Sequence, residues 1–112
     1  MQSKLKFNKI AIIGLGLIGS SIALAIKKHK IAKSVSGYAK SLKTRQIAKK
    51  IKLASKVDSS LEAAVKNADL IIICTPLSSY KKIFKSIKLH LKDGVIITDV
   101  GSAKTKSMKE AQ

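Results

Sequence analysis

The stretch KIAIIGLGLIGSSIALAI, residues 9–26, decides the fold of this 112-residue chain. Its apolar run at residues 10–13 is short and rich in isoleucine, which is typical of a strand buried on both faces of a sheet. A glycine-rich segment follows directly. Beyond it, apolar residues recur at the spacing of one face of a helix, namely Ile18, Ile22, Ala25 and Ile26. The three glycines are therefore predicted to lie at a turn from a strand into a helix.

The glycine segment has the pattern that binds the pyrophosphate of a dinucleotide. Gly14 allows the tight turn, Gly16 lets a phosphate approach the backbone, and Gly19 lets the helix pack closely on the strand. The N-terminus of the helix faces the phosphates with free N–H groups. The predicted cofactor-binding residues here are Gly14, Leu15, Gly16, Leu17, Ile18 and Gly19. A glycine-rich turn in some other α/β protein is the alternative that the motif by itself leaves open.

The size and composition of the chain indicate one domain, which we expect to span residues 1–112. No apolar run approaches the length of a membrane span, and the N-terminal residues lack the apolar core of a signal peptide. We therefore expect a cytoplasmic protein with no membrane partner. Cys74 is the only cysteine, so neither an intrachain disulfide nor a cysteine cluster for a metal is expected. No metal site is predicted.

The formal net charge of +17 raises the question of nucleic acid binding. The lysines are spread along the whole chain, and Arg45 is the only arginine. Recognition of bases and phosphates favours the planar fork of arginine. Solvated lysine faces are therefore the favoured interpretation, with no specific nucleic acid partner.

The rest of the chain alternates between strand and helix patterns. Strands are predicted at 34–38, 53–57, 69–74 and 95–98. One helix is predicted at 42–51, and a second begins at a capping box formed by Ser59 and Glu62 and ends near Asn67. A third follows an apolar stripe from Tyr80 to Leu91, with Ser78 or Ser79 as its N-cap. This alternation predicts an α/β fold with a doubly wound parallel sheet of the Rossmann type. The expected strand order is 3-2-1-4-5, without the sixth strand.

Ligands of such sheets bind at the carboxyl ends of the strands, where the strand order reverses. The turns after four strands are therefore expected to line one crevice. Besides the glycine turn, these cofactor-binding candidates are Tyr38, Ala39, Lys40, Cys74, Thr75, Pro76 and Gly101. Cys74 also fits the role of a small core residue, and Tyr38 that of simple packing.

The choice of cofactor depends on the end of the second strand. A site for NAD usually has an acidic residue about twenty positions beyond the glycines, whereas this sequence has Ala39 there, followed by Lys40. Without the carboxylate, a 2′-phosphate meets no repulsion, and Lys43 and Arg45 add positive charge nearby. The pattern leans toward NADP but leaves NAD open.

The segments GLGLIGSSIALAI, GYA, ADLIIICTP and LKDGVIITDVGSAK together resemble the N-terminal domain of the prephenate/arogenate (cyclohexadienyl) dehydrogenases of tyrosine biosynthesis. The resemblance runs from Lys9 to about Glu110, and its most particular part is Asp99-Val100-Gly101-Ser102-x-Lys104. It implies an oxidative decarboxylation of prephenate or arogenate with hydride transfer to the nicotinamide. Ser102 matches the serine that helps to position the substrate hydroxyl and a catalytic histidine, and Thr75 and Pro76 match the turn beside the nicotinamide.

The resemblance also implies what residues 1–112 do not supply. The family's histidine, its helical substrate and dimerisation domain and its substrate arginines come from later segments, and neither His29 nor His90 follows a strand. We expect the chain by itself to bind the cofactor without turnover, and the full-length form to be a homodimer. Two alternatives stay open: another two-domain enzyme such as a pyrroline-carboxylate or imine reductase, and a stand-alone nucleotide-sensing module.

Overall fold

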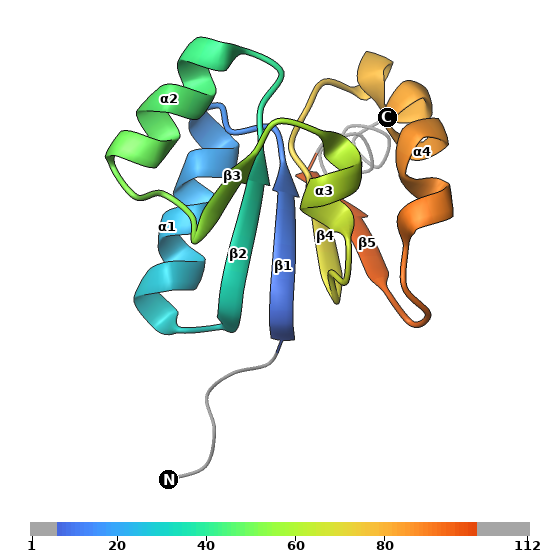
Figure 1. Cartoon of the computed structure of the whole chain (residues 1–112), viewed down its shortest axis with the longest axis horizontal. Helices are drawn as coiled ribbons and strands as arrows, with labels where there is room; N and C mark the ends of the chain where they lie inside the picture. The colour runs from blue at the N-terminus through green and yellow to red at the C-terminus, as the bar shows by residue number, and fades with distance from the viewer. Residues whose placement is uncertain (1–6, 101–112) are drawn as a thin grey trace, which may run out of the picture.

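A five-stranded parallel sheet forms the centre of the computed structural model, which describes residues 7–100 (Figure 1). The strands lie in the order β3-β2-β1-β4-β5, which confirms the predicted topology. Their bounds are β1 Phe7–Ile13, β2 Ala32–Tyr38, β3 Lys56–Asp58, β4 Leu70–Ile73 and β5 Ile96–Asp99. The order reverses between β1 and β4, so the carboxyl ends of these two strands flank the place where such sheets bind ligands.

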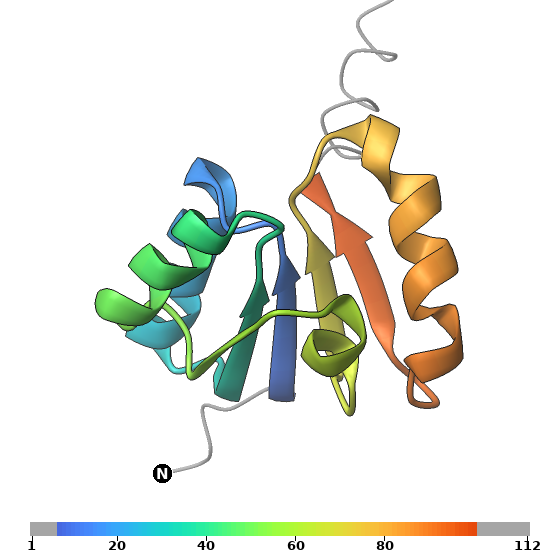
Figure 2. The same cartoon turned by 45° about the horizontal axis from the view of Figure 1, so that its top comes forward.

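The helices cover both faces of the sheet, with α1 and α2 on one face and α3 and α4 on the other (Figures 1 and 2). Their bounds are α1 Leu17–His29, α2 Leu42–Lys50, α3 Leu61–Val65 and α4 Tyr80–Ile87, with short 3₁₀ turns at η1 Leu77–Ser79 and η2 Lys88–His90. None of the helices in residues 7–100 is long and apolar enough to cross a membrane.

The central strand β1 divides its side chains between two cores. Ile10 and Ile12 pack on the side of α1 and α2, whereas Ala11 and Ile13 pack on the side of α3 and α4. All four are at most 1% exposed. This burial on both faces of the sheet explains why residues 10–13 of β1 are all apolar.

The structure corrects the predicted buried face of α1. The buried residues of this helix are Gly19, Ala23 and Ile26, whereas Ile18 is 54% exposed and Ala25 is also exposed. Close packing of Gly19 against the turn before it rotates the helix, so that Ile18 faces outward.

Three local predictions also differ from the structure. Ser60, not Ser59, caps α3 by accepting the N–H of Ala63 at 3.1 Å. Ser79 precedes α4, but its side chain makes no capping hydrogen bond. The strand predicted at 53–57 begins only at Lys56, while Leu53 is buried in the core as part of a loop.

Candidate functional site

Main-chain hydrogen bonds bring three strand ends together at the carboxyl edge of the sheet. The Gly14 N–H donates to the Tyr38 carbonyl at 2.7 Å, and the Cys74 N–H donates to the Ile13 carbonyl at 2.8 Å. Next along the sheet, Ile73 at the end of β4 pairs with Asp99 at the end of β5. The turns after β1, β2, β4 and β5, which the sequence predicted to converge, therefore follow neighbouring strand ends. The last of these turns is described only up to Val100.

Gly14 occupies a backbone conformation that excludes other residues. Its φ is +101°, in the region that L side chains rarely adopt. A Cβ at this position would also stand 2.9 Å from Cγ2 of Thr75, on the turn after β4. Gly14 thus allows the turn after β1 and the turn after β4 to lie in contact.

Gly16 leaves open space in front of the helix. It is the exposed N-cap of α1, and a Cβ built on it would meet no atom of the described residues within 4 Å. In the part of the chain that the structure describes, no side chain caps the helix at this end. The N–H groups of the first helical turn and the positive pole of a 13-residue helix are therefore available to an anion, which is the requirement for binding a pyrophosphate.

Gly19 holds the helix against the turn. A Cβ on Gly19 would stand 1.9 Å from the carbonyl oxygen of Gly14, a distance that no side chain tolerates, and 3.5 Å from Cγ2 of Ile12. The close approach that the motif predicts is thus mainly to the backbone of the turn. It fixes both the start and the rotation of α1.

The other residues of the glycine turn divide by exposure. Leu15 is buried and packs on Gly37 of β2, where a Cβ would stand 2.9 Å from Leu15 Cδ1. Leu17 is 88% exposed, and Ile18 beside it is also exposed. Sequence analysis missed Gly37, although an isolated glycine inside a strand is a known signal of close approach.

The turn after β4 contributes one unpaired polar group. The Oγ1 atom of Thr75 is buried and has no hydrogen-bond partner within residues 7–100. An orphaned hydroxyl beside Gly14 fits a site in which a ligand supplies the partner. Burial raises the pKa of the Cys74 thiol, which keeps it protonated and argues for a packing role. Pro76 is exposed.

The turn after β2 carries positive charge. Arg45 Nη1 donates to the carbonyl of Ala39 at 2.6 Å and to that of Lys40 at 3.0 Å. Ala39 itself is buried against the α1 and α2 core, Lys40 is exposed, and Tyr38 packs on the other face of the sheet. Sequence analysis placed Arg45 near this turn but did not predict that its guanidinium would hold both carbonyls.

Several predicted features lie elsewhere or outside the description. Gly101 and Ser102 fall beyond residues 7–100, so their positions are not described. His29 and His90 are both exposed and lie at the ends of α1 and η2, away from the strand ends. Within the described part of the chain, no group of three or more His, Cys, Asp or Glu side chains is placed to hold a metal.

Comparison with known proteins identifies the same kind of domain. Residues 22–112 match the family model for the nucleotide-binding domain of prephenate dehydrogenase. The cyclohexadienyl dehydrogenase of Zymomonas mobilis is 41% identical over 106 residues, covering 95% of this chain and 36% of that protein. The prephenate dehydrogenase of Lactococcus lactis is 42% identical over 106 residues, covering 92% of this chain and 29% of that protein.

A solved structure agrees at the level of the fold. The prephenate dehydrogenase of A. aeolicus, in complex with hydroxyphenyl propionate and NAD⁺, superimposes with a TM-score of 0.77 at 19% identity. The match covers 87% of this chain and 34% of the other. The chain thus spans about a third of the length of these relatives.

Proposed function

Because this chain belongs to the family of prephenate dehydrogenase nucleotide-binding domains, we propose that it binds NAD or NADP at the carboxyl edge of its sheet. In this proposal residues 1–112 form the dinucleotide-binding domain of a prephenate or arogenate dehydrogenase. The relatives that name this activity are about three times as long, so the enzyme's substrate pocket and dimer contacts are assigned to segments outside residues 1–112.

The open space at Gly16 is the observation that carries the proposal. A glycine with nothing within 4 Å of its missing side chain, at the uncapped start of a 13-residue helix, leaves room for a pyrophosphate beside free N–H groups. Gly14 shapes the turn, and Gly19 fixes the helix to it. The buried Oγ1 of Thr75 supplies a hydroxyl for the bound nucleotide beyond the phosphates.

The reaction needs groups from both parts of the enzyme. A bound nicotinamide would supply the acceptor for a hydride from the ring carbon that bears the substrate hydroxyl. This chain's share is to hold the dinucleotide and, through Ser102, to position the substrate hydroxyl. A histidine from a later segment takes the hydroxyl proton, and loss of carbon dioxide makes the ring aromatic. On this assignment the chain by itself binds cofactor but does not turn over.

The cofactor preference is proposed to lean toward NADP. No carboxylate stands at residues 38–40, and the exposed Lys40 together with Arg45 places two positive charges at the turn where the adenosine ribose is expected. Because Arg45 Nη1 already bonds two carbonyls, its other N–H groups are the ones available to a 2′-phosphate.

Calorimetric titration of the 112-residue chain with NAD and with NADP tests this function. Each titration is run at low salt and at about 0.15 M salt, where attraction between exposed charges beyond about 8 Å is screened. Saturable binding that persists at the higher salt, and that Gly16→Ala weakens, supports a dinucleotide site at the glycine turn. Binding that disappears with salt, or that Gly16→Ala leaves unchanged, overturns the proposal.

A further inference from the structure

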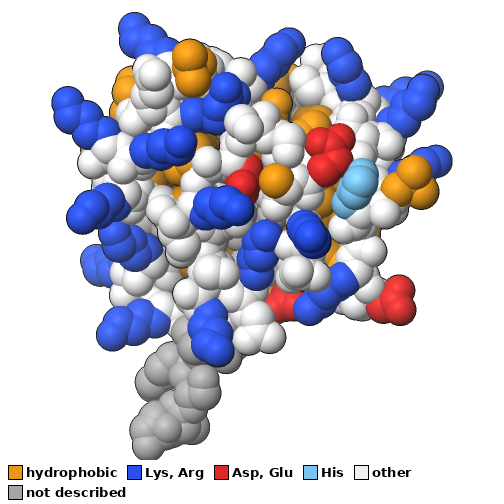
Figure 3. Space-filling model, in the orientation of Figure 1, with side chains coloured by type: hydrophobic (Ala, Val, Ile, Leu, Met, Phe, Trp, Pro, Cys, Tyr) orange, Lys and Arg blue, Asp and Glu red, His pale blue; other side chains and the backbone are white. Residues whose placement is uncertain are grey.

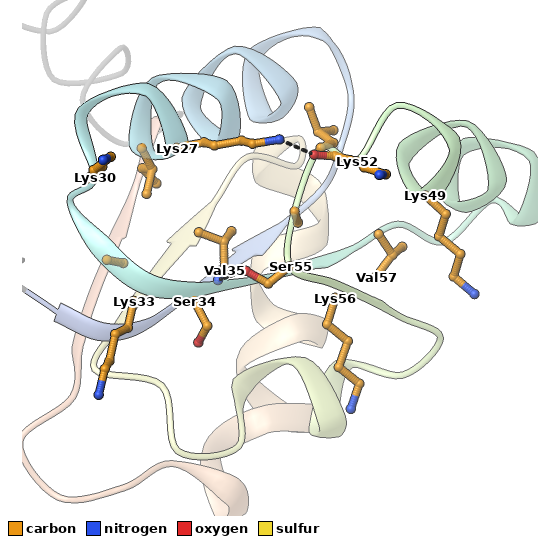
Figure 4. A pocket seen from close by; sticks show the side chains of 14 residues that line it. Lys27, Lys30, Lys33, Ser34, Val35, Lys49, Lys52, Ser55, Lys56 and Val57 are labelled. Atoms are coloured by element: carbon orange, nitrogen blue, oxygen red, sulfur yellow. Dashed lines mark hydrogen bonds between the residues drawn. The ribbon is translucent and has the colours of Figure 1, made fainter.

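A cavity of about 800 Å³ lies at the amino edge of the sheet, on the far side from the glycine turn (Figure 4). It is bordered by the ends of α1 and α2, the first half of β2 and the segment that leads into β3. Its size is within the range of small-molecule sites. The dinucleotide proposed above makes no use of this edge.

Lysines surround this cavity. Six of the residues that line it are lysines, and none of the lining residues is acidic: the six are Lys27, Lys30, Lys33, Lys49, Lys52 and Lys56. The lysines come from both helix ends and from both strands; in Figure 4 the side chain of Lys27 runs across the cavity toward Lys52, whereas those of Lys33, Lys49 and Lys56 start at its border and point outward. Half-buried Ala32 and Ala54, with the buried Val35 and Leu53, form an apolar floor.

The cavity exists because β3 begins late. The β2–β3 pairing covers only Ser36, Gly37 and Tyr38, and the chain before β3 diverges from the first half of β2. Ser55 Oγ accepts the N–H of Val35 at 3.1 Å at the point where the two segments separate. The cavity lies between the two separated segments and is open to solvent.

The backbone holds lysines at the two helix ends that border the cavity. Lys30 and Lys52 both have positive φ, at 49° and 54°, a conformation in which helices more often place glycine. Lys27 Nζ also donates to the Lys52 carbonyl at 3.1 Å, which ties the end of α1 to the end of α2. Helix C-termini carry about half a negative charge each, and Lys56 Nζ lies 3.5 Å from Asp58 Oδ1, so the other five ammonium groups still leave the cavity positive.

We propose that this cavity binds a small polyanion that carries several phosphate groups. Lysine acts as a point charge that pairs with phosphate without the geometric demands of arginine. A ligand with several negative charges can balance the positive charge of several lysines at once, which one monovalent anion does only in part. The site is distinct from the dinucleotide site because the two lie at opposite edges of the sheet.

Inorganic tripolyphosphate serves as the probe, in a titration of the ¹⁵N-labelled chain followed by NMR at about 0.15 M salt. The largest amide shifts are expected around Lys33, Ser34 and Ser55. The double variant Lys33→Gln/Lys49→Gln removes two lining charges that make no side-chain hydrogen bond or ion pair within residues 7–100. It is expected to weaken binding about fivefold, the effect of two surface ion pairs.

Lys81→Gln/Lys85→Gln is the matched control, since both lysines are exposed on α4 and the charge change is the same. It is expected to alter tripolyphosphate affinity by less than about twofold. Equal losses in the two double variants, or shifts confined to residues 14–20, would overturn the proposal in favour of diffuse charge or of the glycine turn. NAD affinity of Lys33→Gln/Lys49→Gln is expected to equal that of the parent chain, so the two proposals fail separately.

Discussion

Leu15 and Gly37 interlock where the glycine turn meets β2. Leu15 is 4% exposed, and a Cβ at Gly37 would stand 2.9 Å from Leu15 Cδ1 and 3.0 Å from Cδ2. Gly37 pairs with Ile12 in the sheet, and Leu15 follows Ile12 by three residues. The shape of the proposed cofactor turn therefore depends on a strand residue that is not part of the glycine motif.

Gly37→Ala is expected to lower the free energy of unfolding by about 1–3 kcal/mol, because the added methyl overpacks a core that has no room for it. Denaturant unfolding of the parent chain and the variant measures the loss. Leu15→Ala removes the side chain that the methyl meets. In a double-mutant cycle the cost of Gly37→Ala should shrink in the Leu15→Ala background, and a purely additive cycle would contradict the contact as the cause.

Gly16→Ala is expected to leave stability nearly unchanged but to weaken dinucleotide binding. Gly16 has a φ of −77° that alanine adopts without strain, and its Cβ would meet no atom of residues 7–100 within 4 Å, so the free energy of unfolding should change by less than about 1 kcal/mol. The methyl would occupy the space assigned to the pyrophosphate, so dinucleotide affinity should fall at least about tenfold. Calorimetry beside an unfolding curve separates the two effects. Unchanged affinity would show that the phosphates lie elsewhere.

The contacts of the Asp69 carboxylate predict how the stability of the chain depends on pH. Its carboxylate accepts the N–H groups of Asn8, at 2.5 Å, and Lys9, at 3.2 Å, and forms an ion pair with Lys92. The hydrogen bond from Lys92, and next that from Asn8, hold the pKa of Asp69 below its ordinary value of 3.8. Because the folded-state pKa is lowered, the stabilisation is present above the unfolded pKa and is lost as the pH falls through the folded pKa.

Asp69→Asn should therefore reduce the loss of stability that the parent chain shows below about pH 4. Thermal unfolding across pH 2–7 measures this, on the approximate scale where carboxylates titrate. Asp93→Asn is the control, since Asp93 is an exposed turn residue and loses the same charge. If both variants changed the pH profile equally, net charge and not the contacts of Asp69 would be responsible.

The fold could be predicted because its signals are local and redundant. The apolar run of β1, the run of β4 and the alternation of helices with strands each indicate a parallel sheet, and the observed order agrees. The rotation of α1 could not be predicted from apolar spacing. It depends on the close packing of Gly19 against the Gly14 carbonyl, whose oxygen would stand 1.9 Å from an added Cβ, and this packing leaves the apolar Ile18 exposed.

The cap of α3 and the start of β3 could not be predicted, because both depend on contacts between side chains and backbone that the sequence pattern does not show. Adjacent serines at 59 and 60 offer equivalent caps, and only the path of the chain after β3 selects Ser60. The late start of β3 accompanies the bond from Val35 to Ser55 Oγ, between segments twenty residues apart. The diffuse lysine surface was predicted, and Figure 3 shows Lys and Arg side chains over the whole of one face of the molecule. Their concentration around one cavity depends on tertiary placement.

Lys40→Glu tests the proposed preference for NADP. Lys40 is exposed and its side chain makes no hydrogen bond or ion pair with the described residues, so the change adds a carboxylate at the turn after β2 with little effect on folding. A negative charge there repels a 2′-phosphate and can accept a hydrogen bond from a ribose hydroxyl. NADP affinity should fall about tenfold or more, while NAD affinity is kept or improved.

Lys50→Glu, at the far end of α2, makes the same charge change away from the turn and should affect both cofactors equally. Parallel losses for NAD and NADP in Lys40→Glu would show that Lys40 contributes general attraction and does not select the 2′-phosphate.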